Sequence, residues 1–265
     1  PEATNENCVN NYDIIKPENT DQKVVSRMME DAVKKLAGKN SLNKSWDDIF
    51  HSFNKRRHNE DRGYRKGEKI FIKINQGTAN GKFRKDDIEK GFYVSPAITQ
   101  SENAKKGLVG TCETYPAVVL ELLRQLVNVA GIDQRNISIG DPISHIFGHN
   151  YEVWSKEFPD IVYLDRASDK FGRTITRPTA SDLLFYSDKK TSDKLYDVIE
   201  DADYLINVAN LKPHIAAGIS LTAKNHFGSQ GRPTAGHLHN YLITPRGAAG
   251  SNGGYHKYRV RVDMM

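Results

Sequence analysis

Apolar side chains recur every three to four positions in two long stretches of the chain, which is the spacing of one face of an α-helix. The first stretch follows Thr20 and Asp21, either of which can cap a helix, and it stops at Gly38. The second stretch follows Thr114, which we expect to be a helix cap, and it stops at Gly131. Both glycines suit the left-handed turn that commonly ends a helix.

Short runs of β-branched and aromatic residues alternate with these helices and indicate buried strands. The runs cover residues 69–75, 136–141, 161–164 and 203–209. Shorter helices are expected around Trp46–Phe53 and from Gly218 to His226. Strands that alternate with helices predict an α/β fold, with a mainly parallel sheet flanked by helices, an irregular N-terminal arm and long loops.

The chain divides by pattern into two parts. Residues 1–60 are expected to form the N-terminal arm and its helices, and residues 61–265 to form the α/β domain. Residues 76–113 show little periodicity, and a connection of this length is usually functional or inserted. The polar start of the chain is typical of a processed, exported protein, and a cytoplasmic location is the alternative.

Polar clusters follow three of the predicted strands. These clusters are Asn75 to Gly77, then Gly140 to Pro142, then Asn207 to His214. Ligands of open α/β sheets bind beyond the carboxyl ends of the strands, and in a parallel sheet these ends lie at one edge. The three clusters are therefore expected to converge on one site.

The third cluster continues into a histidine- and lysine-rich segment that suggests specific roles. His214 is expected to act as an acid or base, because the unperturbed pKa of histidine suits neutral pH. Lys224 is expected to hold an anion or act as a nucleophilic amine, and Asp141 to orient a donor or bind a metal. The expected ligand-binding residues are Asn75, Asn207, Lys212, Asn225, Gly218 and Ser220, with backbone N–H groups near Gly218 facing an anion. Ordinary structural roles for His214 and Asp141 are the alternative.

Metal binding is a further possibility at four histidines. His237 and His239 follow the lysine-rich segment, and His145 and His149 are four residues apart, which places them on one helical face or in a loop. A divalent metal is therefore a candidate cofactor. The chain has two cysteines, Cys8 and Cys112, and no C-x-x-C motif, so it cannot itself form a thiolate zinc site or an iron–sulfur cluster. Whether the two cysteines form a disulfide is open.

Composition limits the class of protein and its partners. The chain has 265 residues and a net charge of +5, and no apolar run approaches the roughly 20 residues of a membrane-spanning helix. Basic and acidic residues are mostly interspersed, and the densest basic stretch covers residues 55–66. This stretch favours a solvated surface, with nucleic-acid binding as the minor alternative, because no nucleic-acid motif accompanies it.

An ordered series of short motifs resembles the family catalogued as domain of unknown function 362. The series consists of Lys73-Ile-Asn75, Thr111 to Pro116, Ile139-Gly-Asp141, Ala202 to Asn207, Leu211 to His214, Lys224 to Gly228 and His237. The resemblance extends over about residues 65–265, and members typically continue further, which implies that the chain is truncated at its C-terminus. Many members carry ferredoxin-type cysteine motifs, which this chain lacks.

A weaker resemblance links the segment from His214 to His237 with nickel-pincer lactate racemases. It implies His214 as a proton-transfer base, Lys224 as the cofactor attachment, and His237 or His239 as a metal ligand. Leu221 and Thr222 stand where those enzymes are glycine-rich.

Together these patterns favour an enzyme of unassigned reaction with an anion- or metal-assisted site for a small molecule. A non-catalytic protein that binds an anionic ligand or a partner protein is the alternative. The two differ in one respect, because a catalytic lysine or histidine should titrate abnormally in an enclosed site. The oligomeric state is left open.

Overall fold

The computed structural model describes residue 4 and residues 6–7, 17–77, 113–166, 169–185, 192–214 and 218–231. Five strands in this part of the chain form one parallel sheet, in the order β4–β3–β2–β1–β7. The strands are β1 (Ile70–Ile74), β2 (Ile137–Gly140), β3 (Val162–Asp165), β4 (Arg173–Ile175) and β7 (Tyr204–Val208). The predicted α/β fold with a parallel sheet is therefore confirmed.

Six α-helices accompany the sheet in the described residues. They are α1 (Gln22–Ala37), α2 (Leu42–His58), α6 (Pro116–Arg124), α7 (Gly148–Ser155), α8 (Asp197–Glu200) and α9 (Thr222–Asn225). Two antiparallel ribbons join β5 (Leu184–Phe185) with β6 (Ser192–Asp193), and β8 (Lys212–His214) with β9 (Gly218–Ser220). None of the described helices has the length and apolar character needed to cross a membrane.

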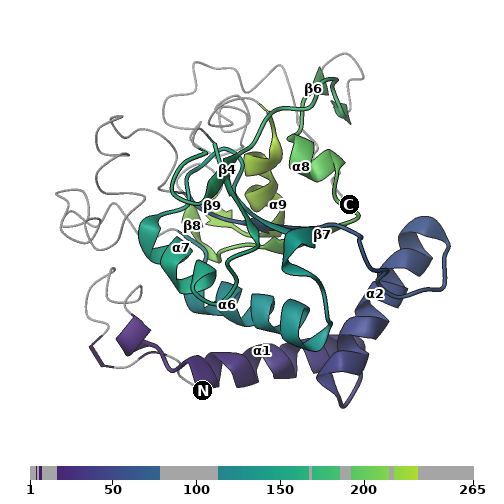
Figure 1. Ribbon diagram of the computed structural model, residues 1–265, viewed down its shortest axis with the longest axis vertical. Coiled ribbons are helices and arrows are strands. Elements are labelled where there is room, and N and C mark those ends of the chain that lie inside the picture. The colour runs from purple at the N-terminus through teal and green to yellow at the C-terminus, as the bar shows by residue number, and fades with distance from the viewer. Residues whose placement is uncertain are drawn as a thin grey trace.

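The first helix is bounded by the residues that the sequence indicates. The Asp21 carboxylate accepts hydrogen bonds from the backbone N–H groups of Lys23 and Val24, which satisfies two donors at the helix start. Gly38 ends α1 with a φ of 65°, a left-handed conformation that glycine adopts without strain. The helix then packs beside α2 and α6, as Figure 1 shows.

The expected cap of the second long helix is wrong, and the reason bears on the site. Tyr115, not Thr114, is the N-cap residue of α6. The Thr114 hydroxyl instead accepts a hydrogen bond from the Asn75 N–H (2.8 Å) and donates to the Val208 carbonyl (2.9 Å). It therefore ties the carboxyl ends of β1 and β7 together. The predicted helix also changes to a π-helical segment at Gln125–Val129 before Gly131.

The two faces of β1 have different surroundings. Ile70, Ile72 and Ile74 are wholly buried and belong to one hydrophobic cluster with side chains of α1, α2 and α6. Successive side chains of a strand point to opposite faces, so Lys73 points away from this cluster. The helices within residues 1–60 thus share the core of the sheet, through residues such as Trp46.

The order of the strands reverses beside β1. The chain places β2, β3 and β4 successively on one side of β1 and then returns to place β7 on the other side. Such a reversal is a topological switch point, and the carboxyl ends of the strands there are where open α/β sheets bind ligands. The strand ends that carry the predicted polar clusters therefore flank this point.

Several elements differ from the expectation. The helix predicted from Gly218 to His226 is instead a strand, β9, followed by the one-turn helix α9 and a 3₁₀ turn. Strand β4 and helix α7 were not predicted, because neither has a strong period: β4 has three residues and α7 has eight. Gly218 therefore lies in a strand, which removes the predicted anion site at a helix start.

Candidate functional site

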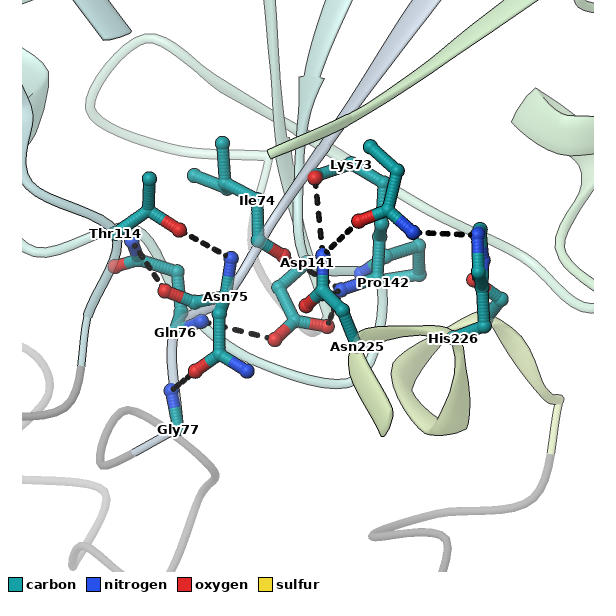
Figure 2. A network of polar contacts seen from close by, with 12 residues as sticks. Lys73, Ile74, Asn75, Gln76, Gly77, Thr114, Asp141, Pro142, Asn225 and His226 are labelled. Atoms are coloured by element: carbon teal, nitrogen blue, oxygen red, sulfur yellow. Dashed lines mark hydrogen bonds and ion pairs between the residues drawn. The ribbon is translucent and has the colours of Figure 1, made fainter. Parts of the chain in front are cut away.

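A buried ion pair lies at the carboxyl end of the central strand. Lys73 is 0% exposed, and its Nζ lies 2.9 Å from the Asp141 Oδ1 (Figure 2). The same Nζ donates to the Ile74 carbonyl (2.6 Å) and to the Asn225 Oδ1 (3.1 Å). Burial lowers the pKa of Lys73 and the charge of Lys212 lowers it further, while Asp141 acts in the opposite direction. The charged form of Lys73, at the centre of the site, is therefore stabilised by its contact with Asp141.

Asp141 connects two strands at this point. It follows β2, and its Oδ2 accepts a hydrogen bond from the backbone N–H of Gln76, which follows β1 (3.0 Å, Figure 2). The Asp141 side chain is almost wholly buried, as is that of Lys73. Because an isolated charge is costly in such surroundings, each group stabilises the charged form of the other.

Two asparagines extend the network toward β7. The Asn225 Nδ2 donates to the Lys73 carbonyl (3.1 Å) and to the Asn207 Oδ1 (2.8 Å). The Asn207 Nδ2 donates in turn to the Thr222 carbonyl (3.0 Å) and to the His226 Nε2 (2.7 Å). Burial and the charge of Lys73 lower the pKa of His226 to about 4, so its ring is neutral at physiological pH. These contacts fix α9 against β1 and β7.

Two further lysines surround this network. The Lys212 Nζ donates to the Asn75 Oδ1 (2.9 Å), and the Lys224 Nζ lies 4.4 Å from the centre of the Phe227 ring. Burial lowers the pKa of Lys224 to about 8, and the charges of Lys212 and Lys73 act in the same direction, against Asp141. We call Lys73, Lys212 and Lys224 the lysine cluster.

Gly228 covers the buried ion pair closely. A Cβ atom at this position would overlap the Asp141 Oδ1 and lie 3.0 Å from the Lys73 Nζ. The 3₁₀ turn that contains Gly228 can therefore approach the pair only because glycine has no side chain.

Replacing Gly228 by alanine is expected to destabilise the protein by about 1–3 kcal/mol, because the added methyl group overpacks the ion pair. Urea denaturation measures the free energy of unfolding. Another glycine such as Gly131 is not a matched control, because its φ of 73° would add backbone strain to an alanine substitution. Ser229→Ala, one residue further along the same turn, is the better comparison and should cost less. Equal stability of Gly228→Ala and the wild type would show that the turn does not press on Asp141.

The structure brings together most of the residues predicted from the sequence. Asn75, Asp141, Asn207, Lys212, Lys224 and Asn225 all belong to or adjoin the network described above. Ser220 is buried in β9, opposite Lys212 in the ribbon register. His214 lies in β8, but its side chain is outside the described part, as are His237 and His239 together with both cysteines.

The two remaining histidines do not form the predicted pair. His145 precedes α7, and its Nδ1 lies 2.9 Å from the Asp165 Oδ1, at the end of β3. His149 is in the first turn of α7, and burial lowers its pKa to about 4. Of the two alternatives, a shared helical face is excluded because the helix begins only at Gly148, and His145 lies in the preceding loop. No group of three or more histidine, cysteine, aspartate or glutamate residues in the described part is placed to hold a metal ion.

Two residues of the site, Lys73 and His226, are not among the site residues expected from the sequence, whereas Gln76 lies within the predicted cluster from Asn75 to Gly77. The signal for Lys73 was present, since it is the one charged residue in an otherwise apolar strand, Ile70–Ile74. A charge at a wholly buried position is rare and usually paired. His226 has no such signal, because its contact with Asn207 depends on the packing of distant segments.

The basic stretch at residues 55–66 precedes the amino end of β1, whereas the network lies at the carboxyl end of this strand. The exposed last turn of α2 consists of Lys55, Arg56, Arg57 and His58. Arg62 is ion-paired with Glu60 and Glu68. Nucleic-acid binding by this stretch stays a prediction.

Comparison with known proteins identifies one family. A family model described as "Domain of unknown function (DUF362)" matches residues 105–257, which is more than half of the chain. The match begins after β1, so Lys73 lies outside it. Neither the curated proteins nor the solved structures include a match. The resemblance to nickel-pincer lactate racemases finds no support in these comparisons.

Proposed function

The chain belongs to the DUF362 family, and we propose that it is an enzyme. In this proposal Lys212 and Lys224 bind a small anionic molecule, and Lys224 exchanges a proton with it. The observation that carries the proposal is the position of Lys224, partly buried among like charges at the carboxyl edge of a parallel sheet. Lysines in such surroundings are typical of groups that transfer protons or attack carbonyl carbons near neutral pH.

The topology of the sheet supports the proposed place of binding. The lysine cluster and its asparagines lie at the carboxyl ends of β1, β2 and β7, where the strand order reverses. This is the place where ligands of open α/β sheets bind. A carboxylate or phosphate there would gain charge-assisted hydrogen bonds from the ammonium groups.

The charges in the network support an anionic ligand. The charges of Lys212 and Lys73 both lower the pKa of Lys224, so a bound anion would relieve the repulsion between these ammonium groups. Lys73 is wholly buried, so its role in this proposal is to maintain the positive potential rather than to contact the ligand. Asp141 holds Lys73 in place and opposes the lowering of its pKa by burial.

The lowered pKa of Lys224 favours an enzyme over a non-catalytic binding protein. A lysine that only holds an anion gains nothing from a pKa near 8, whereas an acid or base is most efficient when its pKa lies near the working pH. His214 stays the second candidate acid or base, and metal binding by His237 and His239 stays a prediction.

Binding of anions provides the test. Inorganic phosphate, pyrophosphate and small dicarboxylates would be titrated calorimetrically into the wild type and into Lys212→Met and Lys224→Met. We expect each variant to bind ten- to a hundredfold more weakly, because a hydrogen bond from a charged group contributes about 1.5–3 kcal/mol.

Lys69 offers a matched control for these variants. It lies next to the opposite, amino end of β1, is exposed and pairs with Asp201. Lys69→Met should therefore bind as the wild type does. Equal weakening by Lys69→Met would indicate a general effect of charge, and unchanged affinity in both site variants would overturn the proposal.

A further inference from the structure

Two consecutive buried residues outside the lysine cluster have unsatisfied polar atoms. His149 is 8% exposed and Asn150 is 0% exposed, at the start of α7. In the described structure neither ring nitrogen of His149 nor the Asn150 Oδ1 has a hydrogen-bond partner. Buried polar atoms are nearly always satisfied, so three unsatisfied atoms on adjacent residues require an explanation.

This pair is connected to the candidate site by a single residue. The Asn150 Nδ2 donates to the Gln76 Oε1 (3.2 Å), and the Gln76 backbone N–H donates to the Asp141 Oδ2 (3.0 Å). Gln76 therefore separates the unsatisfied atoms from the buried ion pair. The same residue, Gln76, thus contacts both the unsatisfied pair and the carboxylate of the buried ion pair.

The hydrogen-bonding capacity of the pair defines the group it would accept. Burial lowers the pKa of His149 to about 4, so the ring is neutral and offers one donor and one acceptor nitrogen. The Asn150 Oδ1 adds a second acceptor. Stacking on Phe147, with ring centres 5.6 Å apart, holds the imidazole in place. A hydroxyl group, which both donates and accepts, matches this set, whereas a second anionic group would meet two acceptors.

We infer that His149 and Asn150 form a polar subsite that binds a hydroxyl group of the anionic ligand, so that the ligand is a hydroxyl-bearing organic acid or organic phosphate. The inference rests on the proposed function, because the lysine cluster supplies the anion site. It adds the second point of recognition and with it the class of ligand.

Pairs of ligands that differ by hydroxyl groups test the subsite. Glycolate would be compared with acetate, and 2-hydroxyethyl phosphate with ethyl phosphate, by calorimetric titration, so that each pair differs by one hydroxyl group. We expect the wild type to prefer the hydroxylated member of a pair by about tenfold, the value of one buried hydrogen bond. In His149→Phe this preference should disappear, while the affinity for the member without a hydroxyl group is kept.

Two further variants separate the subsite from a structural role. His149→Gln keeps a donor and an acceptor and should retain part of the preference for the hydroxylated ligand. His58→Gln, at the exposed end of α2, is the control and should behave as the wild type. Since His149→Phe removes two unsatisfied atoms, it should also melt at a higher temperature than the wild type. Should it fail to fold, His149→Leu serves the same purpose.

Different results would contradict the proposed subsite and the proposed anion site. Equal affinity for both members of each pair in the wild type, or an unchanged preference in His149→Phe, would overturn the subsite and leave the anion site standing. Binding of no anion at all would overturn both. Stabilisation of the wild type, but not of His149→Phe, by Zn²⁺ alone would also overturn the subsite, by showing that His149 is a metal ligand.

Discussion

Replacing Asp141 by asparagine is expected to lower the free energy of unfolding by about 3–5 kcal/mol, the usual cost of removing one partner of a buried ion pair. Asparagine keeps the size of the side chain and an oxygen that can accept from the Gln76 N–H. It removes the charge 2.9 Å from a lysine that is 0% exposed. Lys73 must then either remain charged without its counterion or lose its proton, and both states are costly. Urea denaturation at neutral pH measures the effect.

The double variant distinguishes the ion pair from other effects of the substitution. Adding Lys73→Met to Asp141→Asn removes both charges, and replacing a whole buried pair is often neutral. We therefore expect the double variant to be more stable than either single variant. Asp133→Asn breaks the solvent-exposed pair with Arg135 and should change little. Additive losses in the double variant would contradict the account of the pair.

Lys224 is expected to react with amine reagents at a pH at which other lysines are protected by protonation. With a pKa of about 8, half of its amine is neutral at pH 8, compared with well under one hundredth for an ordinary lysine with a pKa of 10.5. The neutral fraction is therefore about a hundredfold larger. Trace labelling with acetic anhydride across pH 6–11, followed by peptide mass spectrometry, gives the titration midpoint of each lysine independently of its access to the reagent.

The neighbouring charge provides an internal check on this value. Lys212→Met removes an ammonium group that lowers the pKa of Lys224, so the midpoint of Lys224 should move upward. Lys69 is exposed and serves as the reference in the same digest. A Lys224 midpoint equal to that of Lys69 would remove the main argument for proton transfer.

Much of the sheet and the position of the site followed from the sequence. Strand runs have a strong local signal, and the convergence of their ends follows from parallel pairing alone. Parallel pairing thus predicts that Asn75, Asp141 and Asn207 lie near one another. Lys212 and Lys224 were selected because basic residues cluster after the last strand.

Other features of the site could not be predicted, because they depend on contacts between distant segments. The role of Thr114 is set by Asn75 and Val208, each more than 35 residues away, and these contacts override its preference for capping a helix. Gly218 was placed at a helix start, but pairing with His214 makes it part of a strand. A short local pattern contains no signal for either outcome.

The measurement that tests the central claim most directly is the pKa of Lys224 with and without a bound anion. Labelling would be repeated in saturating inorganic phosphate, or in the tightest-binding anion of the calorimetric panel. Because a bound anion stabilises the ammonium form, the account predicts that the midpoint of Lys224 rises above about 8 when the anion binds. A midpoint of Lys224 that stays unchanged while the anion binds would contradict the claim that the lysine cluster is the binding site.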